Sequence, residues 1–367
     1  MGLKLSLLLL NMVYKKYYIL LFGCVVALFL LSFYSFHPKI EGDSVSYIEA
    51  IEFLTEDAAP TGLIYNRIIT TFGGLTVLIV LGPILDLLPA WQIMNFIFFA
   101  ISAFAFFKLL DLLFENRKVA ILGTLFLIAN YAILRFGLAY LMDMGGWAFY
   151  ISSVYFTLKY SKSYDRKNLY KAVVLSSIGG LFKEYAFLAV IPIVVFLVYE
   201  NWPSFRNIFK KSILPALLAV GPIFLVYLYA YIQFDYTYFD WLSTNQAYYL
   251  YDSRIIEYIK SLGSLLNILG ILFVGGLLVL RKQWQSLEIR IKLFLLSIFA
   301  SFLPIFFWPA ITQRILFITV PFTIIISGFL FKKYENRLIW LIPAIVLYLL
   351  VSLTMDSYIL PNITLPV

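Results

Sequence analysis

Long runs of apolar residues are the feature that most constrains what this chain can fold into. The first run, Tyr17–Phe36, has about 20 residues, which is the length that an α-helix needs to cross a bilayer. Of the 367 residues, 62% are hydrophobic and 13% are charged. A chain of this length and composition is typical of a polytopic membrane protein. The sequence therefore predicts an all-α polytopic membrane protein.

Eleven segments are predicted to be transmembrane helices. They are Tyr17–Phe36, Trp91–Phe114, Val119–Gly137, Gly145–Tyr160, Leu169–Leu181, Tyr185–Tyr199, Ile213–Ile232, Leu262–Leu280, Ile291–Trp308, Ile315–Phe331 and Leu338–Thr354. Residues 1–367 are expected to form a single transmembrane domain with no separate soluble domain. No small-x-small cleavage motif follows the first segment, so we interpret it as a full span and not as a signal peptide.

The distribution of basic residues predicts the orientation. Three lysines precede the first span, so the N-terminus is expected to be cytoplasmic. Thr61–Leu88 is also apolar, but if it does not cross, 21 of the 28 Lys and Arg residues lie on the cytoplasmic side. If it crosses, this excess is reversed, which the positive-inside rule disfavours. We therefore expect juxtamembrane helices in an outer loop of residues 37–90, and a second outer loop at residues 233–261.

The scarcity of metal-binding and redox side chains excludes several kinds of site. A single cysteine, Cys24, cannot form a disulfide framework or a thiolate metal site, and a single histidine, His37, cannot form a histidine cluster. A metal ion would need carboxylate ligands, which suit Mg²⁺ or Mn²⁺, so such a divalent cation stays open as a cofactor. The net charge of +8 is attributed to the cytoplasmic loops and not to nucleic acid binding.

A polar stretch, Glu41–Tyr47, follows the first span directly. It places two carboxylates at the end of a helix in a chain with few charges, where helix packing does not require them. We hypothesise that Asp43 is a catalytic base. The alternatives are a solvated loop acid or an N-cap for a helix that begins near Ser44.

Three basic residues on the expected outer face interrupt apolar sequence. Lys183, followed by Glu184, lies in a short link between two spans, Arg314 directly precedes a span, and Arg135 lies near the end of another. Ionisable groups so close to hydrocarbon are costly and mark candidate functional sites. The alternative is that they snorkel to the headgroups or form internal ion pairs, such as Arg135 with Asp143.

These residue types favour chemistry on a lipid phosphate. Arg binds phosphate oxygens through a planar fork and Lys as a point charge, and a nearby carboxylate suits deprotonation of an acceptor hydroxyl. We therefore expect glycosyl transfer from a polyprenyl-phosphate-linked sugar donor to a lipid, glycan or protein acceptor. Asp43 is the predicted base, and the predicted substrate-binding residues are Lys183, Arg314, Arg67, Glu184, Tyr47, Arg254 and Asp143.

The order of these elements resembles the GT-C superfamily of integral membrane glycosyltransferases, which includes protein O-mannosyltransferases and aminoarabinose transferases. The resemblance extends over roughly Tyr17 to Phe331 and rests on the order of short motifs along the chain. These motifs are Gly42-Asp43-Ser44 with Tyr47, Asn66-Arg67, Gly82-Pro83, Phe114-Glu115-Asn116-Arg117-Lys118, Asp143, Lys183-Glu184, and Arg314 before Pro321.

The resemblance implies a catalytic Asp at Asp43, a lipid-phosphate site near Lys183 and Arg314, and a donor and acceptor that meet at the outer leaflet. Metal use varies in this superfamily, and Asp43 and Asp143 are the pair that could share an ion. Some members carry a large soluble C-terminal domain. Here none follows the last span, so acceptor recognition is expected to come from the outer loops.

Two other functions also fit the sequence. A flippase or transporter of lipid-linked sugars would place charged groups near the centres of its helices. Here the helix centres carry few charges, and the charges lie near one face of the membrane. A polysaccharide polymerase or ligase at the outer face would differ mainly in its acceptor. The position of the charges favours an enzyme over a flippase or transporter, and the polymerase or ligase stays open as an alternative.

Overall fold

In the computed structural model, every regular element in the described part of the chain is helical. The structure describes residues 2–56, 62–248, 251 and 253–359. The elements are α1 (Gly2–Phe36), α2 (Asp43–Thr55), α3 (Gly62–Leu85), α4 (Leu87–Phe114), α5 (Arg117–Ile128), η1 (Ile133–Gly137), α6 (Asp143–Ser163), α7 (Arg166–Phe182), η2 (Glu184–Ala189), α8 (Val190–Asn201), α9 (Phe205–Phe234), α10 (Tyr238–Tyr248), α11 (Arg254–Gln283), η3 (Trp284–Ser286), α12 (Ile289–Phe302), η4 (Leu303–Phe307), α13 (Gln313–Leu316), α14 (Thr319–Lys333), η5 (Glu335–Trp340), α15 (Leu341–Thr354) and η6 (Met355–Ile359).

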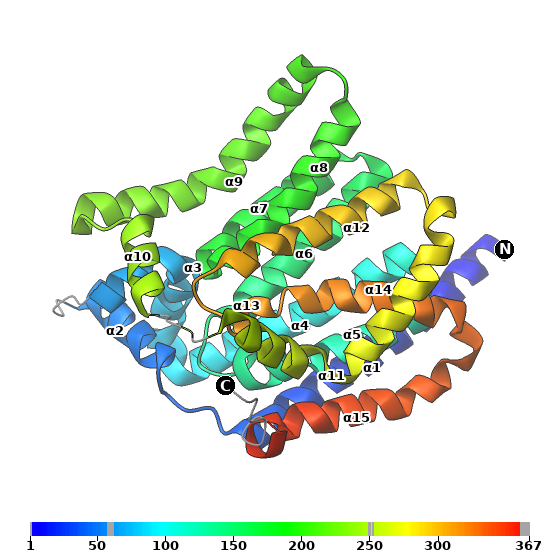
Figure 1. Cartoon of the computed structure of the whole chain (residues 1–367), viewed down its shortest axis with the longest axis horizontal. Coiled ribbons are helices and arrows are strands. Elements are labelled where there is room, and N and C mark those ends of the chain that lie inside the picture. Colours follow the sequence, from blue (N-terminus) through cyan, green and yellow to red (C-terminus); the bar gives the residue numbers. More distant parts are fainter. Residues whose placement is uncertain (1, 57–61, 249–250, 252, 360–367) are drawn as a thin grey trace.

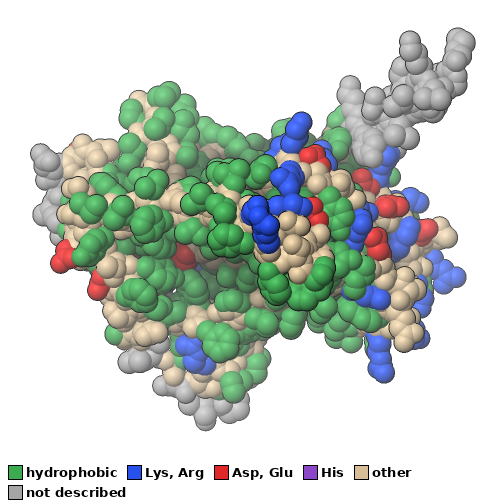
Figure 2. All heavy atoms as spheres, turned by 90° about the horizontal axis from the view of Figure 1, so that it is seen from above, with side chains coloured by type: hydrophobic (Ala, Val, Ile, Leu, Met, Phe, Trp, Pro, Cys, Tyr) green, Lys and Arg blue, Asp and Glu red, His purple; other side chains and the backbone are tan. Residues whose placement is uncertain are grey.

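The long helices form a bundle whose outer surface is apolar. Figure 1 shows the N-terminus near one end of the long axis, α2, α3 and α10 near the other, and α8 and α9 projecting at the top. Hydrophobic side chains cover most of the face seen in Figure 2, and most of its visible Lys and Arg side chains gather toward one end. Leu217 and Ile271 are 64% and 75% exposed. Large aliphatic side chains in such numbers on the surface are suited to lipid.

Eight helices in the described part are long and apolar enough to cross a membrane. They are Lys16–Phe36, Leu63–Leu85, Leu87–Phe114, Glu184–Asn201, Phe205–Phe234, Arg254–Ser286, Ile289–Phe307 and Glu335–Ser357. The prediction of an all-α, multi-pass membrane protein is therefore supported. Seven of the eleven expected spans fall on these helices, and the count of eleven is not confirmed.

Four expected spans have no counterpart among the eight. α5, α7 and α14, which replace three of them, have 12, 17 and 15 residues, fewer than the roughly 20 that a straight crossing needs. α6 has 21 residues but carries a polar set that includes Ser152, Ser153 and Thr157. Most residues of these helices are buried among other helices. Their surroundings are protein rather than lipid. For this reason, length and apolar composition alone do not show whether these four helices cross the membrane.

The expected outer element Thr61–Leu88 contains one long helix, α3, which is kinked at Thr71. By length and composition this helix is sufficient for a crossing. Its contacts, however, lie along one end of the bundle: Arg67 forms an ion pair with Asp43, and Gly74 closely approaches Met142. α3 therefore packs against the end of the bundle that carries Asp43.

A small hydrophobic cluster lies beneath this end of the bundle, apart from the larger core formed by the remaining helices. It joins α2, α3 and the start of α4 to residues 140–142 and 182, and includes Tyr47, Ile68, Leu75, Leu78 and Trp91. The indole nitrogen of Trp91 donates a hydrogen bond to the Leu141 carbonyl at 3.2 Å. The cluster therefore fixes α2 and α3 on the bundle and holds their polar residues above it.

α11 and α14 pack closely at Gly276. A methyl group at this position would lie 2.2 Å from the Ile326 carbonyl oxygen and 2.9 Å from the Ser327 Cα. Small residues allow helix backbones to approach each other in membranes. Both neighbouring atoms belong to the backbone, so they cannot rotate away.

We predict that Gly276→Ala destabilises the fold by about 1–3 kcal/mol, because overpacking forces the two backbones apart. The measurement is thermal unfolding in detergent, followed by gel filtration. Gly263→Ala is the matched control, since it lies in the same helix and has no atom within 4 Å of the added methyl. Equal melting temperatures for the two variants would contradict the packing at Gly276.

Candidate functional site

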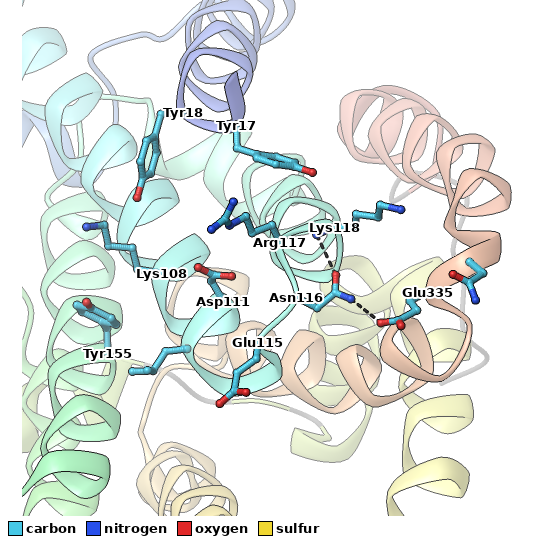
Figure 3. A pocket seen from close by; sticks show the side chains of 12 residues that line it. Tyr17, Tyr18, Lys108, Asp111, Glu115, Asn116, Arg117, Lys118, Tyr155 and Glu335 are labelled. Carbon is cyan, nitrogen blue, oxygen red and sulfur yellow. Dashed lines mark hydrogen bonds between the residues drawn. The ribbon is translucent and has the colours of Figure 1, made fainter. Parts of the chain in front are cut away.

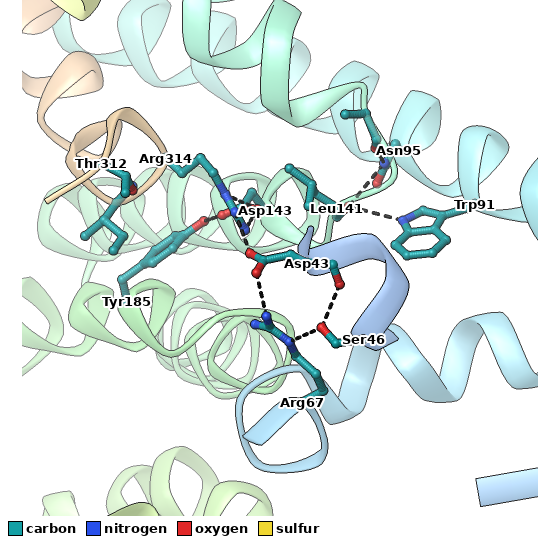
Figure 4. Close-up of polar contacts among 12 residues, drawn as sticks. Asp43, Ser46, Arg67, Trp91, Asn95, Leu141, Asp143, Tyr185, Thr312 and Arg314 are labelled. Atoms are coloured by element: carbon teal, nitrogen blue, oxygen red, sulfur yellow. Dashed lines mark hydrogen bonds and ion pairs between the residues drawn. The ribbon is translucent and has the colours of Figure 1, made fainter. Parts of the chain in front are cut away.

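Arg314 connects two carboxylates that lie 100 residues apart in the chain (Figure 4). Its Nη1 donates to Asp43 Oδ2 at 2.6 Å, and its Nη2 and Nε donate to Asp143 Oδ2 at 2.7 and 3.0 Å. The Tyr185 hydroxyl donates to the other oxygen of Asp143 at 2.9 Å. Asp143 is 1% exposed, so this ion pair is shielded from water on the Asp143 side.

Arg67 holds the second oxygen of Asp43. Its Nη2 lies 2.5 Å from Asp43 Oδ1, and its Nε donates to the Ser46 hydroxyl at 2.8 Å. Asp43 is therefore bound by two guanidinium groups, one on each oxygen. Charge-assisted hydrogen bonds of this kind are short and directional.

Both acids stand at the start of a helix. Asp43 is the first residue of α2 and Asp143 the first residue of α6, where the positive end of the helix dipole stabilises a carboxylate. Gly42, just before α2, has a φ of 57°, a conformation that favours glycine. The expectation that a helix begins near Ser44 is thus close to the structure. The N-cap residue is Gly42, which has no side chain to cap the helix, and the Asp43 side chain points to the arginines.

The cluster keeps both acids ionised. Burial by itself would raise the pKa of Asp43, but Arg314, Arg67 and Lys183 outweigh burial and hold this pKa well below its ordinary value. Burial opposes ionisation of Asp143 too, and there Arg314 and Lys183 lower the pKa. Each acid is consequently a weaker base in this arrangement than an exposed aspartate.

Lys183 completes the basic side of the site. Its side chain is 7% exposed, and no described residue forms an ion pair with its ammonium group. The ammonium lies 5.7 Å from the centre of the Tyr47 ring, and the Arg67 guanidinium lies 4.8 Å from the same centre. The ring of Tyr47 thus makes cation–π contacts with both Lys183 and Arg67.

These charged residues line one cavity of about 390 Å³. Its wall includes six of the eight residues predicted from the sequence, namely Asp43, Arg67, Asp143, Lys183, Glu184 and Arg314. A smaller cavity of about 150 Å³ is also lined by Asp43 and Arg314, together with Glu41, Arg135 and Tyr140. Asp43 and Arg314 therefore face two cavities.

Three sequence interpretations differ from the structure. Tyr47 is buried beneath the cavity and does not line it. Arg254 is also outside the cavity, where it donates to the Trp308 carbonyl at 2.5 Å and supports that loop. Arg135 does not pair with Asp143: its Nε lies 2.6 Å from Oδ2 of Asp356, which belongs to η6 after α15.

Several cavity residues were not identified from the sequence as site residues. Tyr185 follows Lys183-Glu184 directly, so its place in a polar break between apolar helices was the available signal. Trp308 and Trp241 form part of the wall, with ring centres 5.8 Å apart. Nothing in their local sequence links these two tryptophans, which come from a turn before α13 and from α10.

The acids of this cavity have limited capacity for a metal. Within the described residues there is no group of three or more His, Cys, Asp or Glu side chains that could hold an ion. The Arg314 guanidinium bridges Asp43 and Asp143, so an ion shared by these two acids would compete with it.

A larger cavity, about 1010 Å³, lies at the opposite ends of α1 and α4. Figure 3 shows its polar lining, which includes Lys108, Asp111, Glu115 and Arg117. α4 runs from the region of Trp91, near the acid–arginine cluster, to this cavity. It has 28 residues, and each adds about 1.5 Å to the length of the helix. The two polar regions therefore lie at opposite ends of the bundle.

Comparisons with known proteins leave the family of this chain unassigned, because no family model and no curated protein matches it. The site is therefore interpreted from its own chemistry.

We predict that Asp143→Asn lowers the free energy of unfolding by about 3–5 kcal/mol, because it leaves the Arg314 charge without its buried partner. The lowered pKa means that this stabilisation is complete above the ordinary aspartate pKa of about 3.9 and is lost as pH falls through the folded-state pKa. Unfolding in detergent at several pH values measures the difference.

The control for this prediction is Glu257→Gln. Glu257 pairs with Lys260 at 3.2 Å on a more exposed surface, where removal of an ion pair costs about 0–1 kcal/mol. Equal effects of the two variants would show that the Asp143 ion pair is not a buried one.

Proposed function

We propose that this chain is a membrane glycosyltransferase that moves a sugar from a polyprenyl-phosphate donor to an acceptor hydroxyl. Asp43 serves as the general base, and Lys183 and Arg314 hold the donor phosphate. The observation that carries the proposal is the juxtaposition of Asp43, Arg314 and Lys183 in one cavity of a chain with an apolar outer surface.

The proposed reaction is a displacement at the anomeric carbon of the sugar. The acceptor oxygen forms a bond to this carbon and transfers its proton to Asp43. The bond between the anomeric carbon and the phosphate oxygen breaks, and its electron pair leaves with the polyprenyl phosphate. The leaving group gains negative charge, which preorganised cations stabilise in the transition state.

Donor binding would also change the strength of the base. Without a donor, Asp43 is held by Arg67 and Arg314 and its pKa is low. A phosphate that enters the cavity competes for the same guanidinium groups. Once they turn to the phosphate, the pKa of Asp43 rises toward its ordinary value, and the carboxylate can accept a proton. The proposal therefore includes an order in which the donor binds before the base becomes active.

The two cavities support a site for two substrates. Asp43 and Arg314 line both the 390 Å³ cavity, which contains Lys183, and the 150 Å³ cavity, which does not. The phosphate of the donor is assigned to the first cavity because that cavity is larger and contains Lys183, whose ammonium group has no carboxylate partner among the described residues. The acceptor hydroxyl would then approach Asp43 from the second. Its class remains open among lipid, glycan and protein.

The proposal includes the orientation expected from the basic residues. The N-terminus is cytoplasmic and the cavity opens at the outer face, with α3 as an outer juxtamembrane helix. The packing of α3 against the end of the bundle near Asp43 supports this assignment. In the eleven-span topology, α5, α6, α7 and α14 also cross, inside the bundle, where other helices cover them.

We predict that Asp43→Asn lowers transfer by about 10²–10⁴-fold without weakening donor binding, because Asn retains the shape but cannot accept the proton and no longer competes as a charge for the arginines. The measurement is release of polyprenyl phosphate from a panel of polyprenyl-phosphate sugars, with purified protein in nanodiscs. Glu52→Gln is the control, since Glu52 is an exposed acid in the same helix. Near wild-type turnover by Asp43→Asn would refute its role as the base.

We also predict that Lys183→Ala lowers turnover by about 10²–10³-fold and weakens donor binding by a smaller factor, because the phosphate charge grows as the sugar leaves. No described residue forms an ion pair with Lys183, so its removal leaves no unpaired carboxylate partner. Arg314→Lys should retain only part of the activity, since the planar fork is lost. Unchanged turnover in both variants would mean that these cations only snorkel. Binding of donors by the wild type without any turnover would instead favour a transporter.

A further inference from the structure

Glu184 is the acid of the main cavity that the acid–arginine cluster does not use. It lines the cavity beside Lys183. Its Oε2 atom is buried and has no hydrogen-bond partner among the described residues. Asp43 and Asp143, by contrast, accept hydrogen bonds on both of their oxygens. The wall of the cavity thus contains one buried carboxylate oxygen that accepts no hydrogen bond from any described residue.

A buried carboxylate oxygen without a partner carries an energetic cost. Buried polar groups in folded proteins are nearly always hydrogen-bonded, and each exception calls for an explanation. Lys183 attracts Glu184 electrostatically but forms no ion pair with it. A ligand that donates a hydrogen bond to Oε2 would remove the cost, and this would give the ligand affinity and specificity.

An aromatic wall lines the same cavity. Trp241 and Trp308 belong to the lining, and Tyr238 packs on Trp241 with ring centres 4.8 Å apart. Tyr227 stacks on Tyr238 at 5.6 Å, with an angle of 23° between the rings. Burial raises the pKa of the Tyr238 phenol and the Glu184 charge raises it further, so this wall stands near the carboxylate. Flat apolar faces beside a single polar anchor are typical of pockets that orient a small ligand.

We infer that Glu184 and the Trp241–Trp308 wall form the subsite that selects the sugar of the donor. This inference rests on the proposed function, and it assigns the sugar to a part of the cavity distinct from the phosphate-binding cations. The ring face of a sugar packs on the tryptophans, and a hydroxyl or amino group of the ring donates to Glu184 Oε2. Specificity follows because a sugar without that donor would leave the carboxylate unpaired.

The test compares binding of lipid phosphates with and without a sugar. The probes are farnesyl phosphate, farnesyl-phosphoryl-glucose and farnesyl-phosphoryl-glucosamine, and affinity is measured for protein in nanodiscs. The sugar-bearing probes should bind more tightly than farnesyl phosphate to the wild type. Glu184→Gln should reduce this gain by about 10–100-fold for at least one sugar, the range expected for a hydrogen bond to a charged group. Its affinity for farnesyl phosphate should not change.

Two further variants make the result specific. Glu288→Gln removes an acid that is 57% exposed and lies outside the cavity, and it should leave all three affinities unchanged. Trp241→Leu should weaken binding of the sugar-bearing probes but not of farnesyl phosphate. If Glu184→Gln loses more affinity for the glucosamine probe than for the glucose probe, the partner of Glu184 is an amino group. If it loses more affinity for the glucose probe, the partner is a hydroxyl.

The failure of this inference is distinct from the failure of the proposed function. If no sugar improves binding to the wild type, or if the gain persists in Glu184→Gln, the sugar subsite is refuted while phosphate binding stands. If farnesyl phosphate does not bind, or if Arg314→Lys and Lys183→Ala bind it as well as the wild type does, the phosphate site itself is refuted.

Discussion

The contact on which the rest of the site depends is the bridge that Arg314 makes between Asp43 and Asp143. With Arg67 it joins α2, α3, α6 and α13 through four charged side chains. Desolvation of these charges is costly, and their mutual attraction offsets the cost only when the geometry is correct. The cluster therefore adds little net stability for its size, but it strongly favours the one arrangement of these elements in which all four charges are paired.

The same cluster sets a condition on ligand binding. Any anion that uses Arg67 or Arg314 must compete with the carboxylate of Asp43, which both guanidinium groups already hold. Lys183 has no carboxylate partner in the part of the chain that the structure describes, so it offers the more available charge. An anionic ligand would thus bind Lys183 without displacing any carboxylate, but it would bind the arginines only by replacing the carboxylate of Asp43. Competition of this kind lowers affinity for simple anions and favours a ligand that engages the whole cavity.

Physical reasoning from the sequence identified most of the charged side of this site. Lys183 and Arg314 were recognised because ionisable groups beside apolar helices are expensive, and Asp43 because it follows a span with no packing role. The reasoning did not find the partner of Arg135, the supporting role of Arg254 or the contact between Trp241 and Trp308. Those depend on contacts between segments such as α10 and the turn at Trp308, which are far apart in the chain.

The sequence alone determined the helical, membrane-embedded class of this protein, because apolar runs of about 20 residues leave the backbone no other stable arrangement in lipid. It did not determine how many of these helices cross. α6 and α14 are buried by other helices, so their composition reflects protein neighbours as much as lipid. Only the tertiary structure decided that Asp43 and Asp143 share one arginine, because ion pairing depends on distances that helix packing sets and that local sequence does not encode.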